Sequence, residues 1–317
     1  MDEGLLIQMM ELTEEENAVL NNKREIAKDI YTTQAHFVIE SRKFLDMNKL
    51  IQLRKHVRFI DFPKHRHDYI EVNYVYNGKL KQKVGEEPII LKKGELLFLN
   101  QHIYHEIEAS EEEDIVINFI IQPEFFEYIF SYLSTDNIIS NFLINSLYDN
   151  TQNGQYLYFA VSEAGDIQEI MEKLIHELLH PSILSDSTIK LYTGLLMIEL
   201  IKNTDKLKQK KEDPVQQYIM VEVMKYIDGY YQSASLYELA DKLHLPHYGL
   251  SKQIKAATSY TFKELLQEKR LKVAKDLLEG TSLPITNIVN MVGYDNTSYF
   301  YRIFKAKFGL TPQKLRG

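Results

Sequence analysis

The chain has 317 residues, no cysteine, 44% hydrophobic residues and a formal net charge of −8 at pH 7. This length predicts two domains with cores of their own, and the composition excludes a disordered chain, a disulfide framework and a thiolate metal site. The sequence has no apolar run of about 18 residues and no signal-peptide pattern at its start, so we expect a cytoplasmic protein without a membrane partner.

The charge is unevenly divided along the chain. Residues 1–212 carry 23 Lys and Arg against 35 Asp and Glu, a net charge of −12, whereas residues 213–317 carry 14 against 10, a net charge of +4. A polyanionic partner would therefore be bound by the last hundred residues. Because this excess is modest, we expect affinity to rest on individual contacts and on dimerisation.

The first 121 residues divide into a helical extension and a strand-rich segment. In residues 1–30, Thr13 and Glu16 have the spacing of a capping box, which predicts a helix. In residues 31–121, strand-forming runs at 69–76, 96–99 and 115–121 are separated by Gly-bearing turns, and Asn77-Gly78 is a strong hairpin signal. Many short strands of this kind predict a sandwich or a small barrel.

Four side chains of the strand-rich segment could converge on one point: His65, His67, Glu71 and His105. Alternation places the first three on one face if their strand is unbroken. Their spacing relative to Gly78 and Gly94 resembles the cupin barrel. Three imidazoles and a carboxylate could hold a divalent metal, as in cupin enzymes. The alternative is a polar cluster in the mouth of a sensor barrel, around a small effector. We favour the sensor, and with it a chain that is not an enzyme and has no resident metal or cofactor.

Residues 122–202 are expected to be mostly helical and to form a dimerisation segment. Periodicity predicts helices at about 124–133, 136–148, 166–180 and 186–202, with a strand at 156–161. The last helix has more apolar surface than one buried face needs, which fits a subunit interface or an internal core helix equally well.

The helix at 166–180 contains the zincin motif of zinc peptidases, His176-Glu177-x-x-His180, and Glu199 further along the chain is a candidate third ligand. Helical periodicity places the apolar residues on the opposite side from His176, and Pro181 ends the helix at once. A solvated polar face therefore explains the motif better than a peptidase does.

Residues 203–214 are charged, almost without apolar side chains, and end at Pro214, which predicts a linker. After it, residues 215–317 contain one helical pattern twice, since Leu250, Lys252, Ile254 and Lys255 stand fifty positions before Phe300, Arg302, Phe304 and Lys305. In each copy a short apolar helix with Ala240 or Val289 precedes a turn, where Gly293 tolerates a positive φ. A second helix follows, with apolar residues facing inward and Lys or Arg facing outward, and such a helix is the kind that enters a major groove.

A connecting helix is expected between the two copies. Thr261 and Glu264 have capping-box spacing, an apolar stripe follows, and Gly280 stands where a helix end favours a left-handed residue. About 17 residues at ~1.5 Å each span ~26 Å. With the flanking units this approaches the ~34 Å between successive major-groove faces. The repeat therefore favours a double helix-turn-helix over a plain helical bundle.

The residues that agree with one known domain are Leu239-Ala240, Leu250-Ser251-Lys252, Arg270-Leu271, Ala274, Leu277-Leu278, Ile285, Val292-Gly293-Tyr294, Ser298-Tyr299-Phe300, Phe304-Lys305, Phe308-Gly309, Thr311-Pro312 and Arg316. This series resembles the DNA-binding domain of the AraC/XylS family of bacterial transcription regulators. The resemblance implies an α+β multidomain chain with an N-terminal cupin-like sensor barrel, a helical dimerisation segment and a C-terminal all-α double helix-turn-helix. It also implies double-stranded DNA, RNA polymerase, a small effector such as a sugar and a second copy of the chain as partners.

The expected DNA contacts lie on the outer faces of the two second helices. Base edges would be read by Tyr248, Ser251 and Lys252 in the first copy, and by Thr297, Ser298, Tyr301 and Arg302 in the second. Lys255 and Lys305 would contact phosphate, which positions the protein without specifying sequence.

Overall fold

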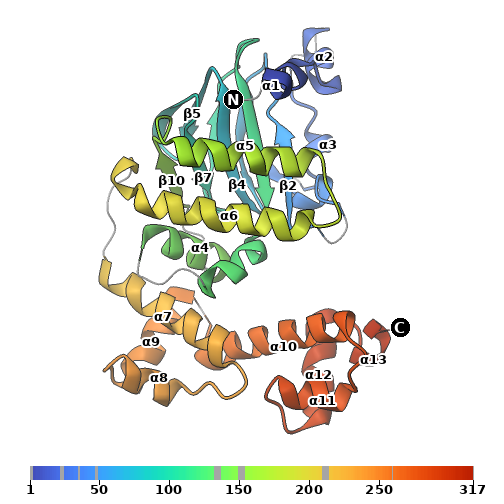
Figure 1. The fold of residues 1–317 in the computed structure, drawn as a ribbon, viewed down its shortest axis with the longest axis vertical. Coiled ribbons are helices and arrows are strands. Elements are labelled where there is room, and N and C mark those ends of the chain that lie inside the picture. The colour runs from blue at the N-terminus through green and yellow to red at the C-terminus, as the bar shows by residue number, and fades with distance from the viewer. Residues whose placement is uncertain are drawn as a thin grey trace. The chain divides into compact units, whose positions relative to one another are not determined.

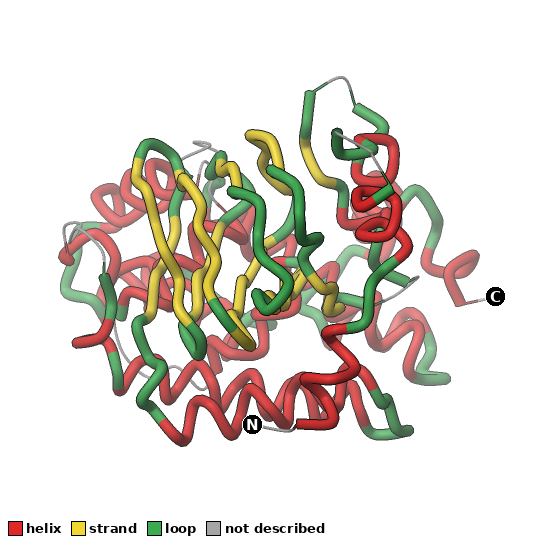
Figure 2. Tube along the Cα trace, turned by 90° about the horizontal axis from the view of Figure 1, so that it is seen from above, coloured by secondary structure: helices red, strands yellow, loops and turns green. Residues whose placement is uncertain are grey.

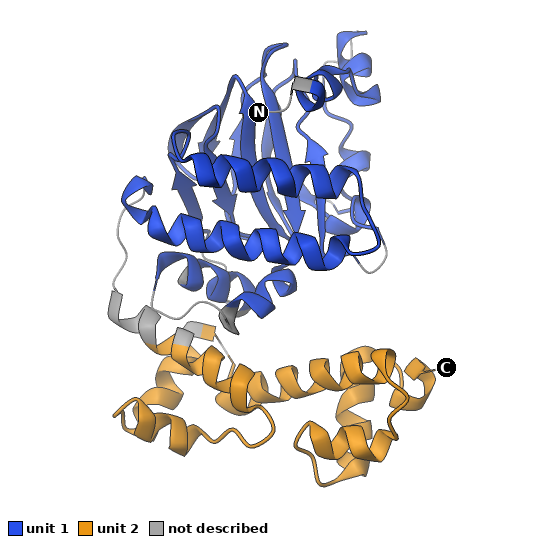
Figure 3. Cartoon of the chain, in the orientation of Figure 1, with its two compact units in different colours: residues 1–133, 137–147, 152–212 blue, residues 134–136, 148–151, 213–317 orange. Residues whose placement is uncertain are grey.

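The computed structural model describes residues 3–21, 25–34, 36–46, 49–131, 137–148, 154–208, 214–258 and 260–316 (Figure 1). The chain divides into two compact units (Figure 3). The first consists of residues 1–133, 137–147 and 152–212, and the second of residues 213–317 with the short pieces 134–136 and 148–151. Part of the expected linker, residues 209–213, lies outside the described residues. Within the described ranges, none of the helices combines the length and hydropathy that a membrane span requires.

The first unit is built on two five-stranded sheets. One sheet has the order β1 (Val38–Ile39), β3 (Phe62–His67), β8 (His105–Ile107), β5 (Lys79–Val84) and β6 (Glu87–Lys92). The other has the order β10 (Tyr156–Phe159), β7 (Leu96–Leu99), β4 (Ile70–Asn77), β9 (Ile115–Ile121) and β2 (Ile51–Lys55). One buried cluster includes side chains from both sheets, such as Leu80, Leu91, Leu97 and Val116. The prediction of a small barrel or sandwich is confirmed, and Figure 2 shows the strands gathered together with helical segments around them.

Two helices, α5 (Gly165–Leu179) and α6 (Ser185–Lys202), lie over the outer face of the second sheet (Figure 1). This cover explains why β4 is buried from residue 70 to residue 76 rather than at alternate positions. Tyr74 of β4 donates a hydrogen bond of 2.7 Å from its hydroxyl to Gln168 of α5.

The remaining elements of the first unit are short. They are α1 (Glu3–Met10), α2 (Glu14–Leu20), α3 (Lys28–Tyr31), η1 (Ser41–Lys43), η2 (Pro123–Ser131), α4 (Ile138–Tyr148) and η3 (Thr204–Lys206). The helix expected at 124–133 is present as the 3₁₀ helix η2, and residues 132–133 lie outside the described residues. Phe126 and Ile129, three residues apart, are both fully buried, and a helix of three residues per turn aligns such a pair on one side.

The N-terminal extension is attached to the barrel by a buried ion-pair cluster. The Thr13–Glu16 capping box of α2 is confirmed, and Glu16 is fully buried. Its carboxylate accepts hydrogen bonds from Arg58 Nε at 2.7 Å and from Lys55 Nζ at 2.8 Å. Burial alone would raise the pKa of Glu16, but these hydrogen bonds lower it to about 2. The extension is therefore part of the first unit and not a free arm.

The second unit is all helical, with α7 (Pro214–Tyr230), α8 (Leu236–Lys242), α9 (His247–Thr258), α10 (Phe262–Gly280), α11 (Ile285–Met291), α12 (Thr297–Phe308) and α13 (Pro312–Arg316). The capping box at Thr261 is confirmed. The left-handed end expected at Gly280 is wrong, because Gly280 remains helical and the following Thr281 is extended. Thr281 ends the helix instead, since its backbone N–H and its hydroxyl both donate to the carbonyl of Leu277.

Removing the Glu16 carboxylate should destabilise the first unit. We expect Glu16→Ala to lower the free energy of unfolding by ~3–5 kcal/mol, because Arg58 and Lys55 would keep buried charges without their partner. Denaturant unfolding measures the loss. The exposed Glu14→Ala is the control, with an expected change within about 0.5 kcal/mol.

The same contact should depend on acid. Because the pKa of Glu16 is lower when folded than the ordinary value of 4.5, its stabilisation is complete above that value and is lost as the pH falls toward about 2. Equal acid sensitivity of the wild type and Glu16→Ala would contradict this role.

Candidate nucleic-acid interface and effector site

The two helix-turn-helix halves share one backbone turn. In the first, the N–H of Leu245 donates to the carbonyl of Ala240, and in the second Tyr294 donates to Val289 in the same way. The residue before each donor has a positive φ, 53° at His244 and 85° at Gly293. The expected positive φ at Gly293 is confirmed. The first half makes the same turn without glycine, which the sequence did not indicate.

Gly293 also lies where no side chain fits. A Cβ there would lie 2.3 Å from the carbonyl oxygen of Gln232 and 2.8 Å from Nη2 of Arg270. Arg270 of α10 donates from Nε to the carbonyl of Tyr231 at 2.7 Å and from Nη2 to that of Gln232 at 2.9 Å. Its guanidinium lies 5.2 Å from the centroid of the Tyr294 ring. Arg270 thus joins the loop after α7 to the turn of the second half, a role that the sequence pattern alone did not reveal.

The second helix of each half presents a polar face. Leu250 and Ile254 of α9, and Phe300 and Phe304 of α12, are fully buried and fix the rotation of their helices. Of the residues expected to contact DNA, those that are exposed are Tyr248, Lys252, Lys255, Ser298, Arg302 and Lys305. Ser251, Thr297 and Tyr301 are half-buried, and Tyr301 packs against the core of the second half. The inward and outward faces therefore follow the predicted periodicity, with Tyr301 at their border.

Two of these side chains have close neighbours. The guanidinium of Arg302 lies 5.3 Å from the centroid of the Tyr299 ring, and the hydroxyl of Tyr299 donates to Gln267 of α10 at 3.2 Å. Lys255 Nζ lies 3.9 Å from a carboxylate oxygen of Glu264, and both side chains are exposed, so this ion pair contributes little. Both cations can therefore reach a polyanion.

The barrel brings His65, His67 and His105 together. One ring nitrogen from each histidine lies within 4.8 Å of the corresponding nitrogens of the other two. His65 and His105 are opposite each other on β3 and β8, with ring centroids 4.1 Å apart. Among the described residues, this is the one group of three whose ligand atoms could share a single ion.

Glu71 also lies beside the cluster, but on a different strand from His65 and His67. The strand is not unbroken, because β3 ends at His67, the chain bends at residues 68–69, and β4 begins in the other sheet. Asp68 holds this bend, since its N–H donates to the carbonyl of Ile39 and its carboxylate accepts from the N–H of Ser41. Glu71 therefore approaches from the opposite sheet, with its oxygens 3.5 Å from Nε2 of His67 and 3.8 Å from Nε2 of His105.

Burial dominates the electrostatics of this cluster. It lowers the pKa of His65 to about 3, lowers the pKa values of His67 and His105 well below the usual value, and raises the pKa of Glu71 to about 7. At neutral pH the three imidazoles are uncharged, which is the form that accepts hydrogen bonds or binds a cation.

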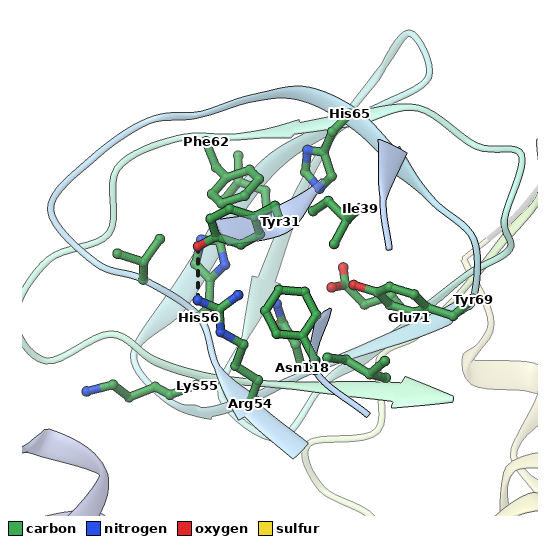
Figure 4. A pocket seen from close by; sticks show the side chains of 14 residues that line it. Tyr31, Ile39, Arg54, Lys55, His56, Phe62, His65, Tyr69, Glu71 and Asn118 are labelled. Carbon is green, nitrogen blue, oxygen red and sulfur yellow. Dashed lines mark hydrogen bonds between the residues drawn. The ribbon is translucent and has the colours of Figure 1, made fainter. Parts of the chain in front are cut away.

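A small cavity opens beside the cluster, lined among others by Tyr31, Arg54, His65, Glu71 and Asn118 (Figure 4). Its volume is about 30 Å³. This admits a water molecule or an ion, whereas pockets for sugar-sized ligands are typically about 300–1,000 Å³.

A larger hollow of about 330 Å³ lies where the start of β2 meets the turn between α5 and α6. Leu50, Phe125, Pro181 and Ile189 contribute to its lining. Sequence patterns do not indicate this hollow, because its walls come from segments far apart in the chain.

The residues of the zincin motif have other partners. His176 on α5 and His180 just after it are exposed, while Glu177 accepts hydrogen bonds from Ser182 and Ser185. Glu199 pairs with Lys202 at 2.6 Å. These contacts fit the polar surface expected of this helix.

Comparisons with known proteins find similarity in both units of the chain. Residues 53–189 match the family model of the AraC-like ligand binding domain, and residues 239–317 match that of a helix-turn-helix domain. The chain is 24% identical over 262 residues to the HTH-type transcriptional activator RhaS of Yersinia pestis (strain Pestoides F), covering 80% of this chain and 89% of the relative. It is 25% identical over 256 residues to RhaS of Mannheimia succiniciproducens, with the same coverage.

A solved structure, the C-terminal domain of AraT, a response regulator from Geobacillus stearothermophilus, has 33% identity. It covers 31% of this chain and 83% of its own, with a TM-score of 0.30.

Filling the space at Gly293 should disrupt the second half. We expect Gly293→Ala to destabilise the second unit by ~1–3 kcal/mol, because the new Cβ would meet backbone at a positive φ. The control is Gly229→Ala in α7, where nothing lies within 4 Å and Ala favours the helix by roughly 0.5–1 kcal/mol. Thermal unfolding of both variants measures the difference, and an unchanged Gly293→Ala would contradict the packing described above.

Proposed function

The chain belongs to the AraC/XylS family of transcription regulators, and we propose that each subunit reads two adjacent major grooves of DNA with α9 and α12. DNA binding and a ligand-binding domain are properties of the family. We further propose that the barrel serves as a sensor rather than an enzyme, and that the protein works in the cytoplasm.

The length of α10 supports the two-groove proposal. Its 19 residues span ~28 Å at ~1.5 Å per residue. The two halves lie at its two ends (Figure 1), and adding the thickness of the flanking helices brings their separation near the ~34 Å of one DNA turn. A helix half as long would set both second helices over the same groove.

The outward-facing and border side chains of α9 and α12 support a division between base reading and phosphate binding. We assign base reading to Tyr248, Ser251 and Lys252 on α9, and to Thr297, Ser298, Tyr301 and Arg302 on α12. Lys255 and Lys305, further along each helix, would bind phosphate. The guanidinium group of Arg302 is suited to bidentate hydrogen bonding with guanine.

Activation would require a contact with RNA polymerase, and the relatives named as transcriptional activators motivate this proposal. In vitro transcription with purified polymerase tests it. A promoter that the protein binds without any increase in transcript would contradict it.

Replacing Arg302 should reduce sequence discrimination. We expect Arg302→Ala to weaken binding to a selected operator by ~1–3 kcal/mol while leaving binding to random DNA nearly unchanged, because a base contact is lost. Fluorescence anisotropy on both duplexes measures the difference.

The matched control is Lys305→Ala, which should weaken both duplexes alike and reduce the salt slope by ~1. Equal losses on both duplexes for Arg302→Ala would show that Arg302 contacts phosphate alone.

We also propose that two subunits associate through an apolar face of α6. Leu184, just before the helix, and Leu191, Leu195 and Ile198 are spaced to lie on one side of it. Their exposed fractions are 66%, 68%, 49% and 36%. A contiguous stripe of exposed aliphatic side chains is costly in water, and a symmetric partner stripe would bury it.

Charge placed on this face should separate the subunits. We expect the wild type to sediment as a dimer and the double variant Leu191→Glu/Leu195→Glu as a folded monomer, because a dimer would bury four unpaired carboxylates. The control, His176→Glu/His180→Glu, adds the same charge to the exposed face of α5 and should remain dimeric. A monomeric wild type, or a dimeric Leu191→Glu/Leu195→Glu variant, would overturn the proposed interface.

A further inference from the structure

We propose that the barrel binds one divalent transition-metal ion through the imidazoles of His65, His67 and His105, with Glu71 beside them. This deepens the sensor function proposed above, on which it rests, by naming an ion as a ligand of the barrel. It departs from the expectation of a metal-free barrel that the sequence favoured, and the reasons lie in the hydrogen bonds of the cluster.

The first reason is that two imidazoles have their protons fixed away from the centre. His65 Nδ1 lies 2.8 Å from the carbonyl oxygen of Pro63, which can only accept, so Nδ1 carries the proton and Nε2 keeps a free lone pair. A metal-binding histidine is held in this way, by a hydrogen bond from its other ring nitrogen to a carbonyl or carboxylate.

His105 is oriented by a longer chain of side chains. Asn73 donates from Nδ2 to Glu71 and to Asn118, both at 3.0 Å, so its oxygen is left to accept from Gln82 Nε2 at 3.0 Å. Gln82 then turns its own oxygen toward His105 Nδ1, at 2.8 Å. Each donor fixes the next acceptor, and the chain ends with the proton of His105 on Nδ1 and the lone pair on Nε2.

The second reason is that the central nitrogens lack hydrogen-bond partners within the described part of the protein. Nε2 of His105 and both ring nitrogens of His67 are buried, and no protein group in the described residues hydrogen-bonds to them. A buried polar atom without a partner costs free energy, roughly 1–3 kcal/mol each. A neutral imidazole has one lone-pair nitrogen, so a ligand that takes lone pairs accounts for Nε2 of His105 and for one of the two ring nitrogens of His67.

The third reason is size. Three atoms no more than 4.8 Å apart lie within about 2.8 Å of a common point, and small side-chain rotations would close this to the ~2.0–2.1 Å of a zinc–nitrogen bond. The cavity of about 30 Å³ beside His65 and Glu71 leaves room for a water molecule as a further ligand.

The donor set also selects the class of ion. Neutral imidazoles with a carboxylate nearby suit Zn²⁺, Fe²⁺, Co²⁺ or Ni²⁺, whereas Mg²⁺ and Ca²⁺ prefer oxygen ligands. A bound cation would also stabilise the ionised form of Glu71, whose burial otherwise opposes ionisation.

Metal content of the full-length, untagged protein tests the proposal. After equilibrium dialysis against Zn²⁺ we expect one ion per chain, and Co²⁺ should give the visible absorption of an imidazole-bound ion, stronger than that of hydrated Co²⁺. No DNA is present, so failure here leaves the DNA-binding proposal standing, and failure of DNA binding leaves this result unaffected.

The variants His67→Asn and His105→Asn should weaken binding by more than about 100-fold, since loss of an outer-shell partner alone typically costs about 10–100-fold. Gln82→Met leaves the three imidazoles in place but removes the acceptor that orients His105 and the donor to Asn73, and it should fall in that smaller range. The control His176→Asn/His180→Asn alters the exposed pair on α5 and should retain one tightly bound ion.

A wild-type protein that binds no ion overturns the proposal, and so does full binding in folded His67→Asn and His105→Asn. If both of these variants fail to fold, the metal affinity of Gln82→Met and the Co²⁺ absorption of the wild type test the proposal instead. Unchanged affinity in Gln82→Met, together with a spectrum of hydrated Co²⁺, would overturn it as well.

Discussion

The packing of helix α10 into both helix-turn-helix halves is the constraint on which the second unit depends. Its first turns carry the buried Phe262, Leu265 and Leu266, and it contacts α7 and α9 there. Its later turns place Leu271, Ala274 and Leu278 in the core of the second half. Between these two sets, Arg270 holds the loop after α7 against the turn at Gly293. Because close-packed cores do not deform continuously, α9 and α12, the helices proposed to read DNA, are held at a fixed spacing.

The barrel of the first unit differs, because its centre is polar. Its centre contains imidazoles, amides and a carboxylate where apolar side chains would pack at lower cost. The side chains are ordered by a directional chain of hydrogen bonds from Glu71 to His105, and that order leaves Nε2 of His105 buried without a hydrogen-bond partner among the described residues. A sensor barrel has reason to keep such an arrangement, since a ligand that completes the cluster stabilises the folded state by its binding energy.

Local signals in the sequence predicted local structure well. The capping boxes at Thr13 and Thr261, the glycine turn at Gly293 and the alternation of buried and exposed faces on α9 and α12 depend on residues within a few positions of one another. The convergence of His65, His67 and His105 was also predicted, although the unbroken strand assumed for Glu71 was wrong.

What the sequence could not provide were contacts between distant segments. The Glu16–Arg58 pair joins residues 42 positions apart, and Arg270 reaches carbonyls 38 and 39 positions away. No local pattern encodes such pairings. His244 is a second feature that the sequence did not predict. It has a positive φ at the position of the turn that Gly293 occupies in the second half, although it is not a glycine.

The most direct test of the two-groove account is a methylation-interference map on a duplex selected from random DNA by the full chain. If α10 sets α9 and α12 in successive major grooves, each subunit should give two clusters of interfering guanines about 10 base pairs apart on one face of the duplex. A single cluster per subunit, or two clusters on opposite faces, would contradict it.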